Sequence, residues 1–158
     1  MRIIRRKNLT ISQKQDVFEL WNKEYPKNLQ YKQISEFDDY LDKHKDQKHI
    51  LLIDENDKVK GWYSDFIRNN ERWFLTILSS EIQGRKFGTQ IIQVAKEENK
   101  ELNGWVIKAD NYIKADGQPY QAPIEFYRKN GFQILDQIQL HTNQISTIKV
   151  QWQNRLQQ

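Results

Sequence analysis

Cysteine is absent from this chain of 158 residues, and its absence excludes several kinds of chemistry. Disulfide bonds, thiolate metal sites and an acyl-cysteine intermediate all need a thiol, so none of them is open to this protein. The sequence also has no apolar run near the roughly 18 residues that a membrane-spanning helix needs. No apolar stretch follows the basic N-terminal residues, as it would in a signal peptide. We therefore expect a cytoplasmic protein that has no membrane partner.

Histidine is scarce as well, with three residues (His44, His49 and His141) scattered along the chain. Their positions show no metal-ligand spacing, so we expect no metal site. Aromatic residues are plentiful: they make up 12% of the chain and offset a mean hydropathy of -0.91. A chain of this length buries roughly two-thirds of its unfolded surface around one core. Because the sequence has no repeats or linkers, we expect residues 1–158 to form a single domain.

Basic residues outnumber acidic ones, which gives a net charge of +4 and an isoelectric point near 9.2. This balance keeps a nucleic-acid-binding domain open as an alternative. Apart from the run Arg2 to Lys7, however, acidic residues interrupt the cations, as in Lys43-His44-Lys45-Asp46. No expected helix carries a continuous basic face interleaved with aromatics. We therefore favour a solvated basic surface and expect no nucleic-acid partner.

Two of the six glycines, Gly84 and Gly88, lie in the most informative stretch of the chain. An apolar, β-prone run from Trp73 to Leu78 enters a short loop that contains the cations Arg85 and Lys86. A helix follows, with apolar residues at helical spacing at Phe87, Ile91, Val94 and Ala95. A strand, a glycine loop and a helix start in this order direct free backbone N–H groups and the positive end of the helix dipole at one spot. Such a spot suits a phosphate group.

The spacing within this loop excludes two common kinds of phosphate site. The loop lacks the Gly-Lys-Ser/Thr of a Walker loop, and it lacks the G-x-G-x-x-G of a dinucleotide site. Instead, Gln83-Gly84-Arg85-Lys86-Phe87-Gly88 follows the pattern Q/R-x-x-G-x-G/A. Lys86 stands in the place of the middle glycine, and a lysine opposes the positive φ that a glycine allows there.

A second pattern lies about forty residues further along the chain. The segment Ile124 to Phe132 predicts a short helix that is closed by Gly131 at its C-terminus, followed by an aromatic residue that begins a strand. The segment contains the motif F-Y-x-x-x-G-F, which starts with Phe126 and Tyr127.

The rest of the chain alternates between strand and helix patterns. Two capping-box patterns, Ser12 with Gln15 and Ser35 with Asp38, predict helix starts. Asn69-Asn70 predicts a hairpin turn, because asparagine tolerates positive φ. The expected strands are residues 2–7, 50–53, 59–67, 72–78, 105–109, 132–141 and 145–152.

The glycine loop, the Tyr127 helix and this order of elements together resemble the GNAT N-acetyltransferase superfamily over nearly the full chain. The resemblance implies an α/β (α+β) fold with a mixed, mostly antiparallel central sheet of about seven strands flanked by about four helices. It implies that the strand before the loop and the strand after the loop's helix splay apart, and that the pantetheine arm of acetyl-CoA fills the gap. The implied enzyme is a monomer or homodimer that uses acetyl-CoA as co-substrate and acetylates a primary amine of a small molecule or peptide.

The resemblance also gives roles to residues at both motifs. The implied CoA-binding residues are Leu78, Gln83, Gly84, Arg85, Lys86, Phe87, Gly88 and Thr89. A backbone N–H near Leu78 would polarise the thioester carbonyl. Tyr127 would act as the general acid for the departing CoA sulfur. Because the chain has no cysteine, direct attack by the amine on the thioester is the simplest route.

A general base is harder to assign from the sequence. Glu71 would lie opposite Arg68 across the hairpin turn, which favours a cross-strand ion pair. Asp65 interrupts an apolar strand and would face Phe74 on the next strand. We consider two roles for Asp65, a catalytic base and a diagonal ion pair with Arg72, to be equally open.

No motif marks the acceptor pocket. We expect the loop of residues 112–119 to help shape it. Four aromatic residues could line it, although we favour simple packing for all of them: Trp62, Tyr63, Tyr112 and Tyr120. A non-catalytic acyl-CoA-binding module of the same fold stays open as an alternative function.

Overall fold

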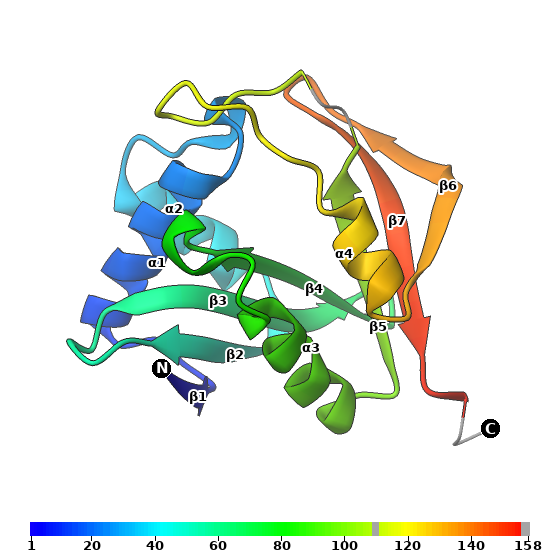
Figure 1. Cartoon of the computed structure of the whole chain (residues 1–158), viewed down its shortest axis with the longest axis horizontal. Coiled ribbons are helices and arrows are strands. Elements are labelled where there is room, and N and C mark those ends of the chain that lie inside the picture. The colour runs from blue at the N-terminus through cyan, green and yellow to red at the C-terminus, as the bar shows by residue number, and fades with distance from the viewer. Residues whose placement is uncertain (109–110, 156–158) are drawn as a thin grey trace.

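The computed structural model describes residues 1–108 and 111–155, which form one seven-stranded sheet with helices on both sides (Figure 1). In sheet order the strands are β1 (Arg2–Arg6), β2 (Lys45–Ile53), β3 (Val59–Arg68), β4 (Glu71–Leu78), β5 (Glu101–Ile107), β7 (Ser146–Gln153) and β6 (Gln133–His141). The α-helices of this described part are α1 (Ile11–Glu24), α2 (Ile34–Asp42), α3 (Phe87–Glu98) and α4 (Ile124–Lys129). Two single turns of 3₁₀-helix are η1 (Lys27–Leu29) and η2 (Ser80–Ile82). The expected mixed, mostly antiparallel sheet is confirmed.

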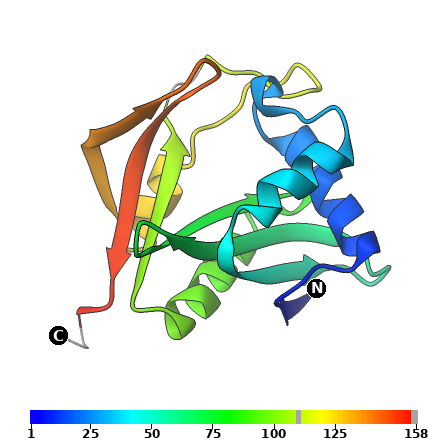
Figure 2. The ribbon, with the colours of Figure 1, turned by 180° about the vertical axis from the view of Figure 1, so that it is seen from behind.

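The helices divide between the two faces of the sheet, with α3 and α4 on one face and α1 and α2 on the other (Figures 1 and 2). Each face has its own apolar core, because neighbouring residues of a strand point to opposite sides. On the α3/α4 face, Tyr63 and Phe74 pack with Ile92 of α3. On the α1/α2 face, Trp62 packs with Trp21 of α1. Trp62 and Tyr63, for which we favour packing over a role in the acceptor pocket, are both fully buried in these cores.

The sheet is nearly divided between β4 and β5. These two strands run parallel and share a single register pair, Trp73 with Asn103. The neighbouring ladders are continuous, from Gly61–Leu78 to Arg68–Glu71 between β3 and β4, and along the whole of β5 beside β7. Beyond Trp73 the two strands therefore diverge, as the resemblance implied.

Both helix starts lie two residues before the positions that the sequence analysis predicted. Thr10, not Ser12, is the N-cap of α1: its side chain accepts the N–H of Gln13 at 3.1 Å, and the Gln13 side chain accepts the N–H of Thr10 at 3.0 Å. Helix α2 begins after Gln33, whose N–H donates to Glu36, not after Ser35. In α1 the first helical residue, Ile11, is 91% exposed, so the buried face of the helix does not extend to its start.

The predicted hairpin turn at Asn69-Asn70 is confirmed, with φ angles of 52° and 62° at the two asparagines. Strand β2 begins at Lys45 and is longer than the expected 50–53, because its polar first half also pairs with β3. Strand β5 ends at Ile107, and Ala109, the last residue of the expected strand 105–109, lies outside the described residues.

Candidate functional site

The glycine loop joins η2 to the start of α3 and exposes its residues 83–86 to solvent. Gly84 has a φ of 78°, and Lys86, the N-cap residue of α3, has a φ of 68°. The lysine therefore adopts the left-handed conformation that we expected it to oppose. This conformation costs a non-glycine residue roughly 1–2 kcal/mol, but the loop keeps the path that a glycine at this position would give it.

The first turn of α3 and its preceding loop form a cradle of the right chemistry for an anion. The first N–H groups of a helix have no acceptor within the helix, and the helix dipole adds positive potential at that end. Arg85 and Lys86 add two exposed cations, and the Arg85 guanidinium lies 5.2 Å from the centre of the Phe87 ring. Gln83 ties the loop to the end of β4, because its Nε2 donates to the carbonyl oxygen of Leu78 at 3.0 Å.

Gly88 is the point at which the two sequence motifs meet. A Cβ atom at this position would lie 3.0 Å from the Phe126 ring on α4 and 3.1 Å from the Leu78 side chain on β4. Only a glycine lets α3 approach both elements so closely. The helix that follows the loop therefore sits directly beside Phe126 and Tyr127, although the two motifs are far apart in the sequence.

The gap between β4 and β5 exposes main-chain polar groups to whatever occupies it. The N–H of Ser79 donates to the carbonyl of Lys60 at 2.8 Å, which shows that the main-chain groups of Ser79 point toward β3. In an antiparallel ladder every second residue bonds to a given neighbour. The N–H and C=O groups of Thr76 and Leu78 therefore point toward β5, on the side where the strands have separated. The Thr76 Oγ1 atom is also buried and has no hydrogen-bond partner among the described residues.

A small cavity of about 40 Å³ lies at this gap. Residues of β4, β5, α4 and the preceding loop line it, together with the C-cap residue of α1: Tyr25, Phe74, Leu75, Thr76, Gly104, Trp105, Val106, Ile107, Tyr120, Pro123 and Tyr127. The sequence motifs pointed to Tyr127, and the loop before it pointed to Tyr120, but no sequence signal singled out Tyr25, Thr76 or Trp105 as a site residue. The alternation along β4 was the available signal for Thr76, whereas Tyr25 is far from both motifs in the sequence.

Tyr127 is packed firmly at the edge of this cavity. It is 5% exposed, and its ring makes edge contacts with Phe74 and Phe132 at centroid distances of 5.7 and 5.3 Å. Burial, and to a smaller extent Tyr120, raises the pKa of Tyr127 well above its usual value of about 10. The hydroxyl therefore keeps its proton at neutral pH and can donate a hydrogen bond.

Asp65 does not line the cavity at Tyr127, and it lies at the end of α3 opposite the glycine loop. Its carboxylate is 2% exposed and accepts hydrogen bonds from Tyr63 at 2.7 Å and Arg72 at 3.0 Å. A third bond, at 3.2 Å, comes from Asn99, the residue that ends α3. The glycine loop lies at the other end of this helix, and twelve helical residues span about 18 Å. Of the two roles left open for Asp65, the structure contains the diagonal ion pair with Arg72. Burial nonetheless raises the pKa of Asp65, against the opposing effect of these partners.

The expected ion pair between Arg68 and Glu71 is wrong, although the two residues are register partners. Glu71 lies 3.6 Å from the Lys149 ammonium of β7 instead. The Arg68 guanidinium lies over the rings of Phe66 and Trp73, at 5.0 and 5.7 Å from their centres.

A further expectation concerns Tyr112. The Tyr112 hydroxyl accepts the N–H of Ser146 at 2.9 Å, so this residue fixes the loop of residues 112–119 to the start of β7.

The described residues contain no group of three or more histidine, aspartate or glutamate side chains that could hold a metal ion. Among the same residues, no helix has both the length and the apolar character needed to cross a membrane.

Comparisons with known proteins find similarity in structure alone. No protein-family model matches the sequence, and no curated protein matches it either. An aminoglycoside 6'-N-acetyltransferase complexed with coenzyme A is similar in structure over 97% of both chains, with 14% identity and a TM-score of 0.69. A GNAT superfamily phosphinothricin acetyltransferase from Sinorhizobium meliloti, in complex with AcCoA, matches 97% of this chain and 89% of its own, with 13% identity and a TM-score of 0.66.

A spermidine/spermine N-acetyltransferase from Vibrio cholerae matches 96% of this chain and 92% of its own, with 15% identity and a TM-score of 0.61. At identities this low, the similarity shows the fold. It extends over nearly the whole described sheet and its helices, which agrees with the resemblance found in the two motifs. The chain has the fold of the GNAT N-acetyltransferases.

Proposed function

We propose that this protein transfers the acetyl group of acetyl-CoA directly to a primary amine of a small molecule or peptide. The observation that carries this proposal is the close approach of α3 at Gly88 to Leu78 of β4 and to Phe126, whose neighbour Tyr127 lines the cavity at the open edge of β4. Structures of the same fold with bound coenzyme A or AcCoA support the choice of co-substrate. The exposed cations Arg85 and Lys86 suit the charge of its pyrophosphate.

The chain offers groups for the pyrophosphate, the pantetheine arm and the thioester of the co-substrate. Main-chain N–H groups of Gly84 to Thr89 would hold the pyrophosphate, with Gln83 fixing the loop to β4. The main-chain groups of Thr76 on the free edge of β4 would pair with the amides of the pantetheine arm, since buried polar main-chain groups need partners. The Leu78 N–H would also stabilise negative charge on the thioester carbonyl oxygen during attack.

Tyr127 would stabilise the leaving sulfur as the amine displaces it. The carbon–sulfur bond breaks as the carbon–nitrogen bond forms, and the hydroxyl of Tyr127 donates a hydrogen bond to the developing thiolate. Its raised pKa keeps this donor protonated, which makes complete proton transfer unfavourable compared with hydrogen bonding. Asp65 has a structural role in this proposal, and solvent water takes up the proton that the amine loses.

The first test is a calorimetric titration of the protein with acetyl-CoA. We expect micromolar binding, and a loss of at least about a hundredfold in the variant Arg85→Glu/Gly88→Pro, because one change reverses a charge of the cradle and the other distorts the first turn of α3. Arg85→Glu alone separates charge from backbone distortion. Lys7→Glu reverses an exposed charge outside the loop and should bind as the wild type does.

An absence of binding in the wild type would overturn the proposal. Binding in the wild type leads to a screen of primary amines for CoA release. Tight binding with no release from any amine would favour a non-catalytic acyl-CoA-binding module instead.

A further inference from the structure

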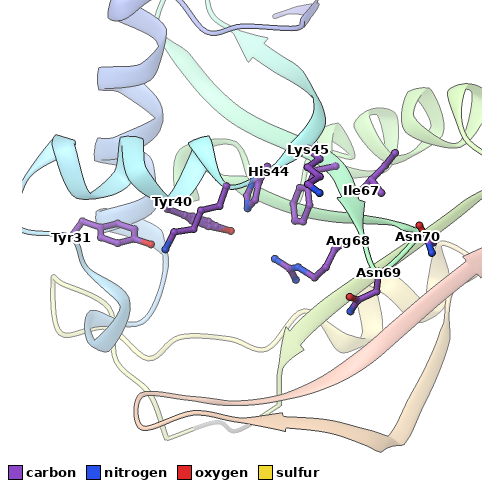
Figure 3. A pocket seen from close by; sticks show the side chains of 10 residues that line it. Tyr31, Tyr40, His44, Lys45, Ile67, Arg68, Asn69 and Asn70 are labelled. Carbon is purple, nitrogen blue, oxygen red and sulfur yellow. The ribbon is translucent and has the colours of Figure 1, made fainter.

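A second and larger cavity, of about 780 Å³, opens on the α1/α2 face of the sheet (Figure 3). It lies between the end of α2, the start of β2 and the hairpin that joins β3 to β4. The lining residues are Tyr31, Tyr40, Lys43, His44, Lys45, Phe66, Ile67, Arg68, Asn69 and Asn70. Three of them are cations and none is an aspartate or glutamate. We call this cavity the α2 pocket.

Arg68 is the cation most clearly available to a ligand in this pocket. Its side chain reaches toward Tyr40 and away from the Asn69-Asn70 turn (Figure 3). The guanidinium lies over the faces of the Phe66 and Trp73 rings, and it forms no ion pair or hydrogen bond with any described residue. The opposite residue on β4, Glu71, is engaged by Lys149. The fork of N–H donors on Arg68 is therefore free to bind a planar oxyanion with two bonds.

The aromatic walls of the α2 pocket suit the body of an organic ligand. The His44 ring stacks on Phe66 with a centroid distance of 3.7 Å and an interplanar angle of 10°. Burial and the charge of Arg68 lower the pKa of His44 to about 4, so the ring is neutral at pH 7. Its Nδ1 atom is buried and has no partner among the described residues.

Two rows of rings connect the α2 pocket to the small cavity at the β4–β5 gap. In one row, Arg68 lies over Trp73, and Trp73 stacks on Trp105 at 5.1 Å. In the other, Tyr40 contacts Trp21 at 5.1 Å, and Trp21 contacts Tyr25 at 4.7 Å. Trp105 and Tyr25 both line the gap cavity. No lining residue is common to the two cavities, and these two rows of rings lie between them on the face of the sheet opposite α3 and α4.

The spacing between the cavities sets the length of a molecule that could reach both. Trp73, under Arg68, and Thr76, at the gap, are three residues apart on β4. Three strand residues correspond to about 10 Å. An acceptor whose oxyanion binds Arg68 must therefore place its amine about that far away.

We infer that the α2 pocket selects an elongated acceptor, with an oxyanion at one end and the reactive amine about 10 Å away at the other. The inference rests on the proposed function. Arg68, with Lys43 and Lys45 at the mouth, binds the oxyanion, while the amine enters the gap cavity beside Tyr127. The same three cations repel a second positive charge, so polycationic amines are poor ligands.

Three compounds of equal length and different end charge test this inference: 8-aminooctanoate, its neutral amide 8-aminooctanamide, and 1,8-diaminooctane. Binding is measured through intrinsic tryptophan fluorescence, to which Trp73 and Trp105 contribute, so the measurement does not need turnover. We expect 8-aminooctanoate to bind about tenfold more tightly than the amide, and the diamine to bind least, as a charge-assisted pair predicts. 8-Aminooctylphosphonate distinguishes a phosphate-like ligand from a carboxylate.

The variant Arg68→Gln should reduce this preference to within about twofold, whereas Arg6→Gln removes an exposed arginine on β1, outside the pocket, and should preserve it. Equal binding of the three compounds, or tightest binding of the diamine, would overturn the inference even if all three release CoA. Selective binding of 8-aminooctanoate without CoA release would support the oxyanion site and count against the proposed function.

Discussion

The two faces of the sheet differ in how their candidate sites are built: one from residues that are neighbours in the sequence, the other from residues that are far apart in it. On the α3/α4 face, consecutive residues build the anion cradle, and one motif supplies Tyr127. On the α1/α2 face, the α2 pocket is assembled from α2, β2 and the β3–β4 hairpin, with no local pattern. A main-chain site for a fixed ligand needs a defined backbone path, which a few glycines and a helix start provide. A side-chain site for a variable ligand needs only that distant residues meet.

The largest effect should come from a change on the α3/α4 face. Tyr127→Phe removes one hydroxyl and should lower kcat roughly a hundredfold, because a positioned donor to a leaving group typically contributes that much. The affinity for acetyl-CoA, measured by calorimetry, should stay within about threefold, since the ring remains packed on Phe74 and Phe132. Tyr112→Phe removes a hydroxyl that binds a backbone N–H elsewhere and should keep kcat. A kcat near wild type in Tyr127→Phe would remove the proposed role of its hydroxyl.

The second prediction is that acid lowers the free energy of unfolding through a histidine on the α1/α2 face. Burial lowers the pKa of His49 to about 4, and its Nδ1 accepts a hydrogen bond from the Trp62 indole at 3.0 Å. A histidine whose folded pKa is depressed contributes stability above its unfolded pKa of about 6.5. This contribution is lost as the pH falls from there to about 4, and it amounts to roughly 3 kcal/mol.

His49→Gln keeps an acceptor for the indole and does not titrate. Denaturant unfolding between pH 7 and pH 4 should therefore show a shallower loss of the free energy of unfolding in this variant than in the wild type. His141→Gln, a change at an exposed histidine of β6, should leave the wild-type slope unchanged. Equal slopes in the wild type and His49→Gln would mean that His49 does not couple this face to pH.

The smallest effect should come from relieving the backbone of the cradle. Lys86 has a φ of 68°, so Lys86→Gly should raise the free energy of unfolding by about 0.5–1 kcal/mol, the left-handed penalty less the greater chain entropy of glycine. The variant Lys86→Ala removes the same charge but keeps the strain, so it should not be stabilised. Thermal unfolding of both variants measures the difference. A Gly variant no more stable than the Ala variant would show that the conformation carries no strain.

The sequence predicted the α3/α4 face better than the α1/α2 face for a physical reason. Gly88, Gly131 and the Tyr127 motif each set local backbone geometry, and local geometry is written in neighbouring residues. The pairing of Glu71 with Lys149 was missed because the two residues meet across β5, from strands far apart in the chain. Register alone favoured Arg68 as the partner of Glu71. The rings of Phe66 and Trp73 compete for the arginine, and the sequence does not reveal which contact is stronger.

The helix starts teach the same lesson on a smaller scale. Thr10 and Gln13 satisfy the same pattern as Ser12 and Gln15, and two candidates so close together cannot be ranked by residue type. The exposed Ile11 places the start outside the buried face of α1. The gap cavity was only partly predictable, because its wall at Thr76 follows from strand alternation while its wall at Tyr25 depends on where α1 ends.

The single register pair between β4 and β5 has a mechanical consequence. The sheet consists of two stiff halves joined at one crossing, so its rigidity beyond Trp73 depends on what lies in the opening. On the proposed function, the pantetheine arm takes the position of an absent strand, and the protein's cohesion varies with its co-substrate. At a ligand concentration of 100 times Kd, such binding adds about 2.7 kcal/mol to the free energy of unfolding. Without acetyl-CoA the protein would then have a lower free energy of unfolding, and its lifetime before degradation would depend on the supply of the co-substrate.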